Sequence, residues 1–181
     1  MQSKRALTNV ETLRKQARKH IEEGAVTAGY AADREAVLKL LNEALATEIV
    51  CVLRYRRHNF MARGIYSKGI AEEFLAHSNE ELGHADQIAE RIVQLGGEPD
   101  FAPDSLTGRS HAEYVAGKTL VGMIKEDLVA ECIAIDSYRE MIQYLGENDP
   151  TTSDLLKGIL AVEEEHADEL ADLLEGLPES R

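Results

Sequence analysis

EELGHAD, residues 80–86, lies in a stretch whose apolar residues recur at the spacing of an α-helix. The apolar stripe is formed by Ile70, Phe74, Ile88 and Ile92. Its continuation passes through Glu81 and His84, although charged side chains are costly to bury without a partner. The sequence therefore places two side chains of metal-ligand type where core residues are expected.

VEEEHAD, residues 162–168, repeats this feature, and both strings contain E-x-x-H-A-D. Glu163 and His166 also interrupt an apolar stripe. Residues three apart on a helix share a face, so one metal ion can take both side chains. A single E-x-x-H is more often part of a solvated helix face, but two such strings on apolar faces indicate a metal site.

Two further glutamates interrupt apolar stripes on other predicted helices. Glu48 and Glu131 each precede an E-x-x-H string at a nearly equal interval, so the chain consists of two similar halves. Four buried carboxylates would repel one another and lose their charge, whereas two divalent cations would neutralise them. Carboxylates and imidazoles suit iron or manganese, and this ligand set is that of the di-iron carboxylate bundles.

Four long helices are predicted from periodicity, over residues 33–63, 67–95, 112–145 and 151–174. The first and third connections are short, so each joins antiparallel neighbours. The middle connection, 96–111, is a loop by composition and spans up to about 53 Å when extended. A predicted helix of about 30 residues measures about 45 Å, so the extended middle connection can run the length of the bundle. The predicted fold is all-α, a four-helix bundle with one long crossover between its second and third helices.

The net charge of −13 is unevenly distributed. Residues 1–20 carry +5, so we expect a basic N-terminal arm over residues 1–30 and an acidic bundle over residues 31–181. An acidic body attracts cations and repels nucleic acid and anionic membranes. The sequence contains neither an apolar run of transmembrane length nor an N-terminal apolar signal segment, so a cytoplasmic protein without a membrane partner is expected.

Two segments resemble the first half of a bacterioferritin: LLNEALATEIVCVLRY (40–55) and HSNEELGHADQIAERIVQLGGEP (77–99). The resemblance covers about residues 35–175. It implies a ferritin-like fold, a ferroxidase centre with two iron ions per subunit and a hollow homo-oligomeric cage. By position, one iron would be held by Glu48, Glu81 and His84 and the other by Glu131, Glu163 and His166. Glu81 and Glu163 would be able to bridge the two.

The chain departs from the bacterioferritin pattern in ways that change the expectation. Leu82 stands where bacterioferritins have the methionine that ligates haem, so no haem is expected. The chain ends shortly after His166, without room for the fifth helix of cages with twenty-four subunits. It therefore looks more similar to the Dps-like branch, with twelve subunits. Some of those proteins carry a cysteine pair near the metals. For Cys51 and Cys132, however, we expect free thiols buried as small apolar side chains.

Several residues near the predicted ligands have open roles. Tyr55 and Tyr138 each follow a ligand glutamate by two helical turns, so their hydroxyls could bond ligating carboxylates. We include Tyr55 in the predicted catalytic set, against the alternative of an ordinary core tyrosine. His77 and Asp127 each precede a ligand glutamate by one turn. They either extend the site as transit positions for iron or lie at a solvated end of the bundle.

Glu80 and Glu164 flank ligands but point away from them, so we expect surface charges. Gly83 has no explanation from the sequence. The leading functional hypothesis is oxidation of Fe²⁺ by O₂ or H₂O₂, followed by storage of the ferric product in a cage. One alternative is a di-iron oxygenase or peroxidase that acts on another substrate. Another is DNA binding of the Dps type through the basic arm, and manganese could replace iron.

Overall fold

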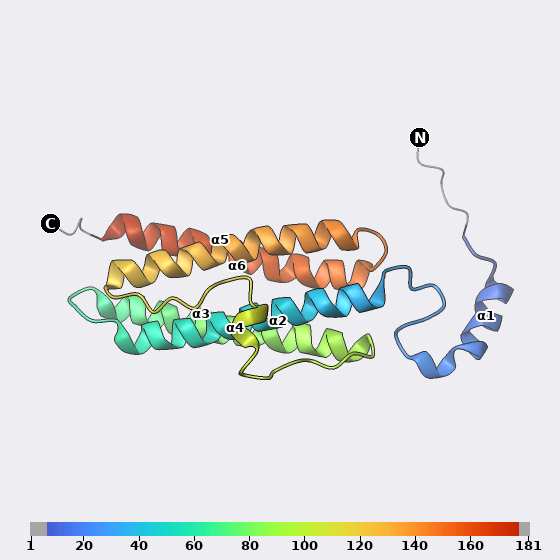
Figure 1. Ribbon diagram of the computed structural model, residues 1–181. Helices are drawn as coiled ribbons and strands as arrows, with labels where there is room; N and C mark the ends of the chain where they lie inside the picture. The colour runs from blue at the N-terminus through green and yellow to red at the C-terminus, as the bar shows by residue number, and fades with distance from the viewer. Residues whose placement is uncertain (1–6, 178–181) are drawn as a thin grey trace.

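The computed structural model describes residues 7–177, and this part of the chain is helical without a strand (Figure 1). The long helices are α2 (Arg34–Met61), α3 (Ser67–Gln94), α5 (Leu120–Leu145) and α6 (Pro150–Gly176). The shorter elements are α1 (Val10–Lys19), the 3-10 helix η1 (Ile21–Glu23) and α4 (Leu106–Arg109). The predicted four-helix bundle is confirmed.

Side-chain caps fix where three of the long helices begin. The Asp33 carboxylate accepts a hydrogen bond from the amide of Ala36 at the start of α2. At the start of α5, the Thr119 hydroxyl accepts one from the amide of Gly122. Asp149 caps α6, whose first residue is a proline. Helix α3 is followed by Gly96 with φ of 72°, a left-handed conformation that glycine adopts without steric cost. Local sequence thus sets the helix ends.

The bundle consists of two antiparallel hairpins, α2–α3 and α5–α6 (Figure 1). Residues 62–66 and 146–149 make the short connections within the hairpins. Residues 95–119 run back along the bundle and include α4, so α3 and α5 are parallel. This is the topology expected from the lengths of the three connections.

The helix predicted over residues 112–145 begins late, and the prediction is wrong for residues 112–119. Gly117 has φ of 60°, which a right-handed helix does not allow. The carbonyl of Ala116 accepts hydrogen bonds from Arg57 and from Nε2 of His58. Arg54 donates to the carbonyl of Glu113 at 3.0 Å. The segment is therefore extended along α2 and fixed by side chains of that helix.

The apolar core forms two main clusters at different heights of the bundle. One includes Leu41, Leu45, Ile88, Ile92, Met141 and Ile159. The other includes Tyr55, Phe74, Ile124, Ala130 and Leu170. On each long helix, the predicted metal ligands lie between residues of the two clusters. A polar layer thus separates the two halves of the core.

The N-terminal segment differs from the bundle. Helix α1 buries none of its residues and lies apart from the four long helices (Figure 1). Closer to α2, Val26 and Tyr30 pack against the core, and the Tyr30 hydroxyl donates to Asp149 at 2.9 Å. The predicted division at residue 30 stays a prediction, and Lys4 and Arg5 of the arm lie outside the described residues. Across residues 7–177, no helix combines the length and apolar character needed to cross a membrane.

Candidate metal centre

All six predicted ligands meet in the polar layer between the two apolar clusters. Each long helix contributes at least one of them: Glu48 from α2, Glu81 and His84 from α3, Glu131 from α5, Glu163 and His166 from α6. None is more than 5% exposed to solvent. Glutamate and histidine are rarely buried unless they are paired or bind a metal.

The first group of ligand atoms surrounds the ring of His84. Its Nδ1 atom lies 2.9 Å from Oε1 of Glu163, 3.3 Å from Oε2 of Glu81 and 3.4 Å from Oε2 of Glu48. The potential ligand atoms of these four residues all lie within 4.8 Å of one another. This is a four-ligand group with one imidazole and three carboxylates.

The second group surrounds His166. Its Nδ1 atom lies 3.5 Å from Oε1 of Glu81 and 3.7 Å from Oε2 of Glu163. Glu131 completes this group, whose potential ligand atoms also lie within 4.8 Å of one another. Glu81 and Glu163 belong to both groups, so each can bridge two metal ions. The shared carboxylates come from the two E-x-x-H strings.

The same residues hold the buried side-chain atoms that lack a hydrogen-bond partner. Among residues 7–177 these atoms are Oε2 of Glu48, Oε1 of Glu81, Oε2 of Glu131, both Oε atoms of Glu163 and Nδ1 of His166. Leaving a buried polar atom unsatisfied costs about 1–3 kcal/mol. Here every such atom is a potential ligand, so the donor set fits a pair of divalent cations.

The electrostatics of the layer favour positive charge. Burial, followed by the charges of Glu163 and Glu48, raises the pKa of Glu81 well above its usual range. Burial lowers the pKa of His84, but the facing carboxylates of Glu163, Glu48 and Glu81 outweigh this effect and raise the pKa to about 12. The pKa of His166 is raised to about 9, again against the effect of burial. Protons and metal ions therefore compete for the same atoms.

Two tyrosine hydroxyls bind the carboxylates that the two groups do not share. Tyr55 on α2 donates to Oε1 of Glu131, and Tyr138 on α5 donates to Oε1 of Glu48. Burial, and next the charge of the glutamate it faces, raises the pKa of each phenol well above its usual range. Both phenols therefore stay protonated and fix one carboxylate oxygen. The Tyr55 hydroxyl thus lies against Glu131, a predicted ligand, whereas the catalytic role of Tyr55 stays a prediction.

A polar groove lies beside the centre, between α3 and α6. Glu80 lies at the surface, as predicted, with its side chain 53% exposed, but its Oε2 lies 2.7 Å from Nε2 of His166, a contact that the sequence did not predict. Glu164 pairs with Arg139 at the surface, as expected. His77 is 1% exposed, and its ring stacks on His166 at 3.9 Å between centroids. The site therefore extends outward through His77 and Glu80.

Asp127 lies neither at a transit position for iron nor at a solvated end of the bundle, the two alternatives that the sequence left open. Its carboxylate is fully buried and accepts from Nε of Arg54 and from Nδ1 of His58, each at 2.7 Å. Asp127 thus neither faces the groove nor lies at a solvated end. Because Arg54 and His58 also bond the crossover, this network connects α2, α5 and the segment between the hairpins.

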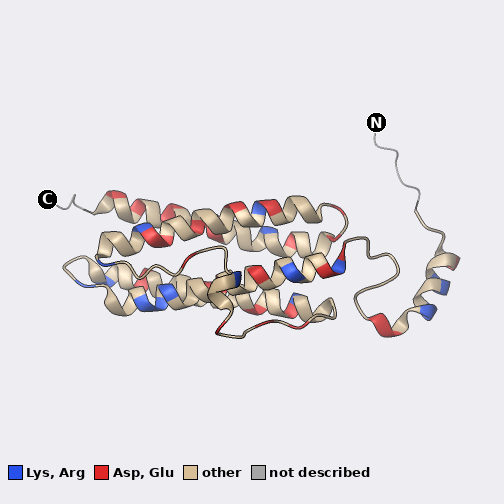
Figure 2. Cartoon of the chain, in the orientation of Figure 1, with Lys and Arg blue, Asp and Glu red and all other residues tan. Residues whose placement is uncertain are grey.

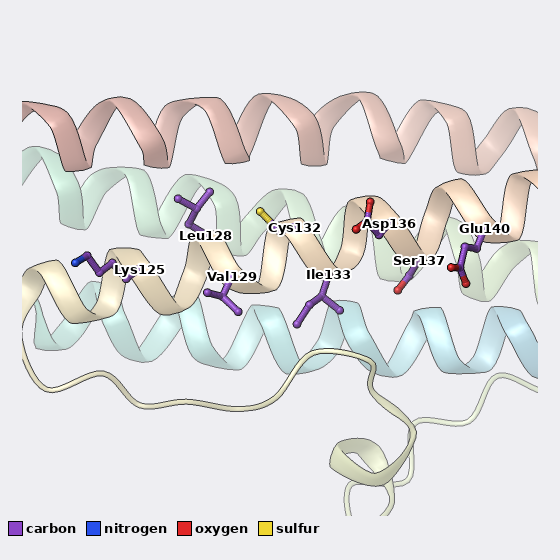
Figure 3. A pocket seen from close by; sticks show the side chains of 8 residues that line it. All are labelled: Lys125, Leu128, Val129, Cys132, Ile133, Asp136, Ser137 and Glu140. Carbon is purple, nitrogen blue, oxygen red and sulfur yellow. The ribbon is translucent and has the colours of Figure 1, made fainter.

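The two cysteines have different environments, and both are free thiols. Cys51 is buried, as predicted, but Cys132 is exposed, so the prediction that both are buried is wrong. Cys132 lines an open groove of about 720 Å³ along α5 with Leu128, Val129 and Ile133 (Figure 3). Leu82 is 42% exposed on α3. The expectation that the protein binds no haem stays a prediction.

Comparisons with known proteins agree on the family of the chain. The ferritin family, described as a ferritin-like domain, matches residues 38–180. The bacterioferritin of Mycobacterium avium is 33% identical over 140 residues, which cover 77% of this chain and 84% of that protein. The bacterioferritin of Streptomyces coelicolor is 30% identical over 148 residues, with 80% and 84% covered.

Solved structures give the same result for the fold. The bacterioferritin-related protein of Bacteroides fragilis, described as a dodecameric thioferritin, has a TM-score of 0.78 at 27% identity. The match covers 92% of this chain and 94% of that one. Dps from Thermosynechococcus elongatus has a TM-score of 0.75 at 23% identity, covering 77% and 90%.

Proposed function

The chain belongs to the ferritin family, and from this premise we propose that it oxidises Fe²⁺ and stores the ferric product. The observation that carries the proposal is that every buried unsatisfied side-chain atom among residues 7–177 belongs to one of five of the six predicted ligands, all but His84. Two divalent cations would satisfy these atoms and balance four carboxylates with two neutral imidazoles. Iron is thus both the metal that the site binds and the substrate that it oxidises.

Each residue of the site has a defined task in this proposal. Glu48 and His84 bind one Fe²⁺, Glu131 and His166 bind the other, and Glu81 and Glu163 bridge them. Each bound Fe²⁺ supplies one electron, so the pair delivers two electrons to O₂ or H₂O₂. The hydroxyls of Tyr55 and Tyr138 keep the terminal carboxylates oriented, because each fixes one oxygen.

Two neighbouring glutamates allow a matched test of the site. Glu163→Gln removes a bridging carboxylate, whereas Glu164→Gln makes the same change at a surface ion pair. Each variant is loaded with Fe²⁺ without oxygen, and oxidation is followed after O₂ or H₂O₂ is admitted. We expect Glu163→Gln to oxidise iron more than about tenfold more slowly than wild type and Glu164→Gln to match wild type. Equal oxidation rates in the two variants would refute the assignment of Glu163. In wild type, the oxidant that gives the faster reaction, O₂ or H₂O₂, is the working one.

For the assembly, we propose a homo-oligomeric cage of twelve subunits. The support is the dodecameric thioferritin, which matches nearly the whole chain. Native mass spectrometry of the metal-loaded protein measures both subunit number and metal content. A dodecamer that holds iron is expected. A monomer or dimer with two metals per chain would instead favour an oxygenase or peroxidase, and a manganese-filled site would change the substrate.

A second candidate function is DNA binding through the N-terminal arm. Helix α1 carries Arg14, Lys15, Arg18 and Lys19 and buries none of its residues (Figure 2). Several arms on one cage could contact a duplex through its phosphates, with strong salt dependence. The acidic body opposes this contact. A gel shift at low salt decides it: no retardation by the cage, or equal retardation after removal of residues 1–20, eliminates the candidate.

A further inference from the structure

Helix α1 has an apolar face that the rest of the described chain, residues 7–177, leaves uncovered. The side chain of Asn9 caps the helix and its last turn is basic, so the local sequence favours a helix here. Val10, Leu13 and Ala17 lie on one face because they are three and four residues apart. The helix nevertheless buries none of its residues, and Leu13 is 50% exposed. A helix of 10 residues is only marginally stable in water by itself, so α1 needs a surface to pack against.

The open groove along α5 offers such a surface. Leu128, Val129, Cys132 and Ile133 line its first half, and Asp136 and Glu140 line its second half (Figure 3). Val129 is 54% exposed although it lies among apolar neighbours, and Lys125 lies at the apolar end. The groove is thus apolar towards the start of α5 and acidic towards its end. This pattern suits an amphipathic helix whose basic residues follow its apolar ones.

The charges of α1 complement those of the groove. Arg14 and Arg18 flank the apolar face of α1, and Glu11 lies in the first turn. The side chain of Asp136 is 79% exposed although it pairs with Arg139, so it can accept a second cation. Opposite charges at the rim of a contact speed the encounter and fix its register.

Helix geometry makes this match specific for one direction. Along α1, Arg18 lies about 7.5 Å beyond Leu13. Along α5, Asp136 and Glu140 lie about 4.5 Å and about 10.5 Å beyond Ile133. If α1 runs parallel to α5 with Leu13 beside Ile133, Arg18 lies between the two carboxylates. The antiparallel direction would bring the acidic start of α1 to these carboxylates, which would repel it.

We propose that α1 docks in the α5 groove of a second copy of this chain, parallel to α5. Its apolar face then covers Val129, Cys132 and Ile133, and its arginines meet Asp136 and Glu140. The occupant is a second copy because α1 projects past the end of its own bundle at which α2 begins (Figure 1). Helix α1 also precedes the residues that match the ferritin family, so this contact is an addition to the ferritin-like domain. The docking rests on the proposed homo-oligomer but not on iron oxidation.

The exposed thiol of Cys132 reports on the docking. In the full-length protein, Leu13→Cys places a thiol on the apolar face of α1, and Thr12→Cys places one on its polar face. Disulfide formation with oxidised glutathione is followed on denaturing gels without reductant, and mass spectrometry identifies the joined peptides. We expect Leu13→Cys to form dimers, joined from position 13 of one chain to Cys132 of another, at least about tenfold faster than Thr12→Cys. Adding Cys132→Ser should abolish these dimers.

Three other outcomes would overturn the docking. Equal crosslinking of Leu13→Cys and Thr12→Cys would mean that α1 moves freely, as DNA binding requires. A disulfide between position 13 and Cys132 within one chain would mean that α1 covers its own groove. If native mass spectrometry shows the cage but Leu13→Cys forms no crosslink, the docking fails and the proposed assembly stands.

A charge exchange tests the register independently. In the Leu13→Cys protein, Arg14→Glu with Arg18→Glu should slow crosslinking to Cys132 about tenfold, because the glutamates would face the acidic end of the groove. Adding Asp136→Arg with Glu140→Arg should restore the rate, since attraction returns with the signs reversed. Crosslinking that neither charge change affects would overturn the contact between the arginines of α1 and these carboxylates.

Discussion

Tyr138 on α5 donates a hydrogen bond to Glu48 on α2, so one hairpin orients a ligand carboxylate of the other. Tyr55 makes the reciprocal bond, from α2 to Glu131 on α5. The two halves of the sequence repeat thus make equivalent contacts: each hairpin supplies a tyrosine hydroxyl that bonds a glutamate of the other hairpin. Each phenol bonds the carboxylate that belongs to only one of the two groups of potential ligands.

Removal of the Tyr138 hydroxyl should destabilise the metal-free protein. In Tyr138→Phe, Oε1 of Glu48 loses the donor it has in the wild type while it stays buried. We expect the free energy of unfolding to fall by about 1–3 kcal/mol, measured by urea denaturation. Tyr144→Phe on the same helix is the control, because Tyr144 is 54% exposed. If both variants unfold at the same urea concentration as wild type, the bond contributes nothing.

Asp127 should matter for stability more than for the chemistry of the centre. Asp127→Ala would leave Arg54 and His58 buried without their carboxylate. Removing one partner of a buried ion pair costs about 3–5 kcal/mol, so the midpoint of thermal unfolding should fall sharply. Asp136→Ala, on the exposed face of α5, should leave the midpoint close to wild type. A small effect of Asp127→Ala would show that the crossover does not depend on this network.

The cap of α6 predicts how stability changes with pH. Burial alone would raise the pKa of Asp149, but hydrogen bonds from Thr152 and Tyr30 and the charge of Arg91 lower it. Folding thus favours the ionised form. The stabilisation is complete above the pKa of an unfolded aspartate, about 3.9, and is lost as the pH falls through the lower folded value.

Asp149→Asn should therefore be less stable than wild type by about 1–3 kcal/mol at neutral pH, where the bonds to an ionised acceptor are lost. The difference should be constant from pH 7 to pH 5 and should shrink at more acidic pH. Urea titrations at each pH measure it. A difference that persists unchanged at pH 3 would mean that the ionised form of Asp149 is not the stabilising one.

Gly83 lies in the helix interior and lines the α3/α6 groove, with no atom within 4 Å of an added Cβ. Gly83→Ala should therefore stabilise the protein by up to about 1 kcal/mol, because glycine is a poor helix former. Gly83→Leu should gain similar helix stability but narrow the groove and slow Fe²⁺ oxidation. Gly158→Leu provides the control, since Gly158 also has open space and does not line the groove. Equal oxidation rates in both leucine variants would mean that access through the α3/α6 groove does not limit Fe²⁺ oxidation.

The sequence was sufficient to predict the four long helices and the six side chains that meet in the polar layer, because both depend on periodicity along one helix. That these six side chains bind metal stays a prediction. Glu81 and His84 are recognisable since they interrupt an apolar stripe. The role of Glu80 could not be predicted in this way, because it depends on how closely α6 approaches α3. Glu80 leaves α3 in a direction away from the predicted ligands, yet its long side chain reaches His166 on α6.

The crossover shows a second limit of periodicity. Residues 112–119 fit a helix by composition, but Ala116 bonds side chains of α2, and Gly117 adopts a left-handed conformation. Asp127 was ambiguous for the same reason, since its partners Arg54 and His58 lie on a different helix. Contacts between distant segments decided both cases.

Neither hairpin carries a complete four-ligand group, since each group combines residues of α2 or α5 with glutamates from both α3 and α6. During synthesis, the first hairpin leaves the ribosome with Glu48, Glu81 and His84 but without Glu163. The growing chain thus cannot assemble either group until the second hairpin has packed against the first. We therefore expect metal uptake to follow the packing of the two hairpins, so that a partly folded chain would not hold redox-active iron at this site.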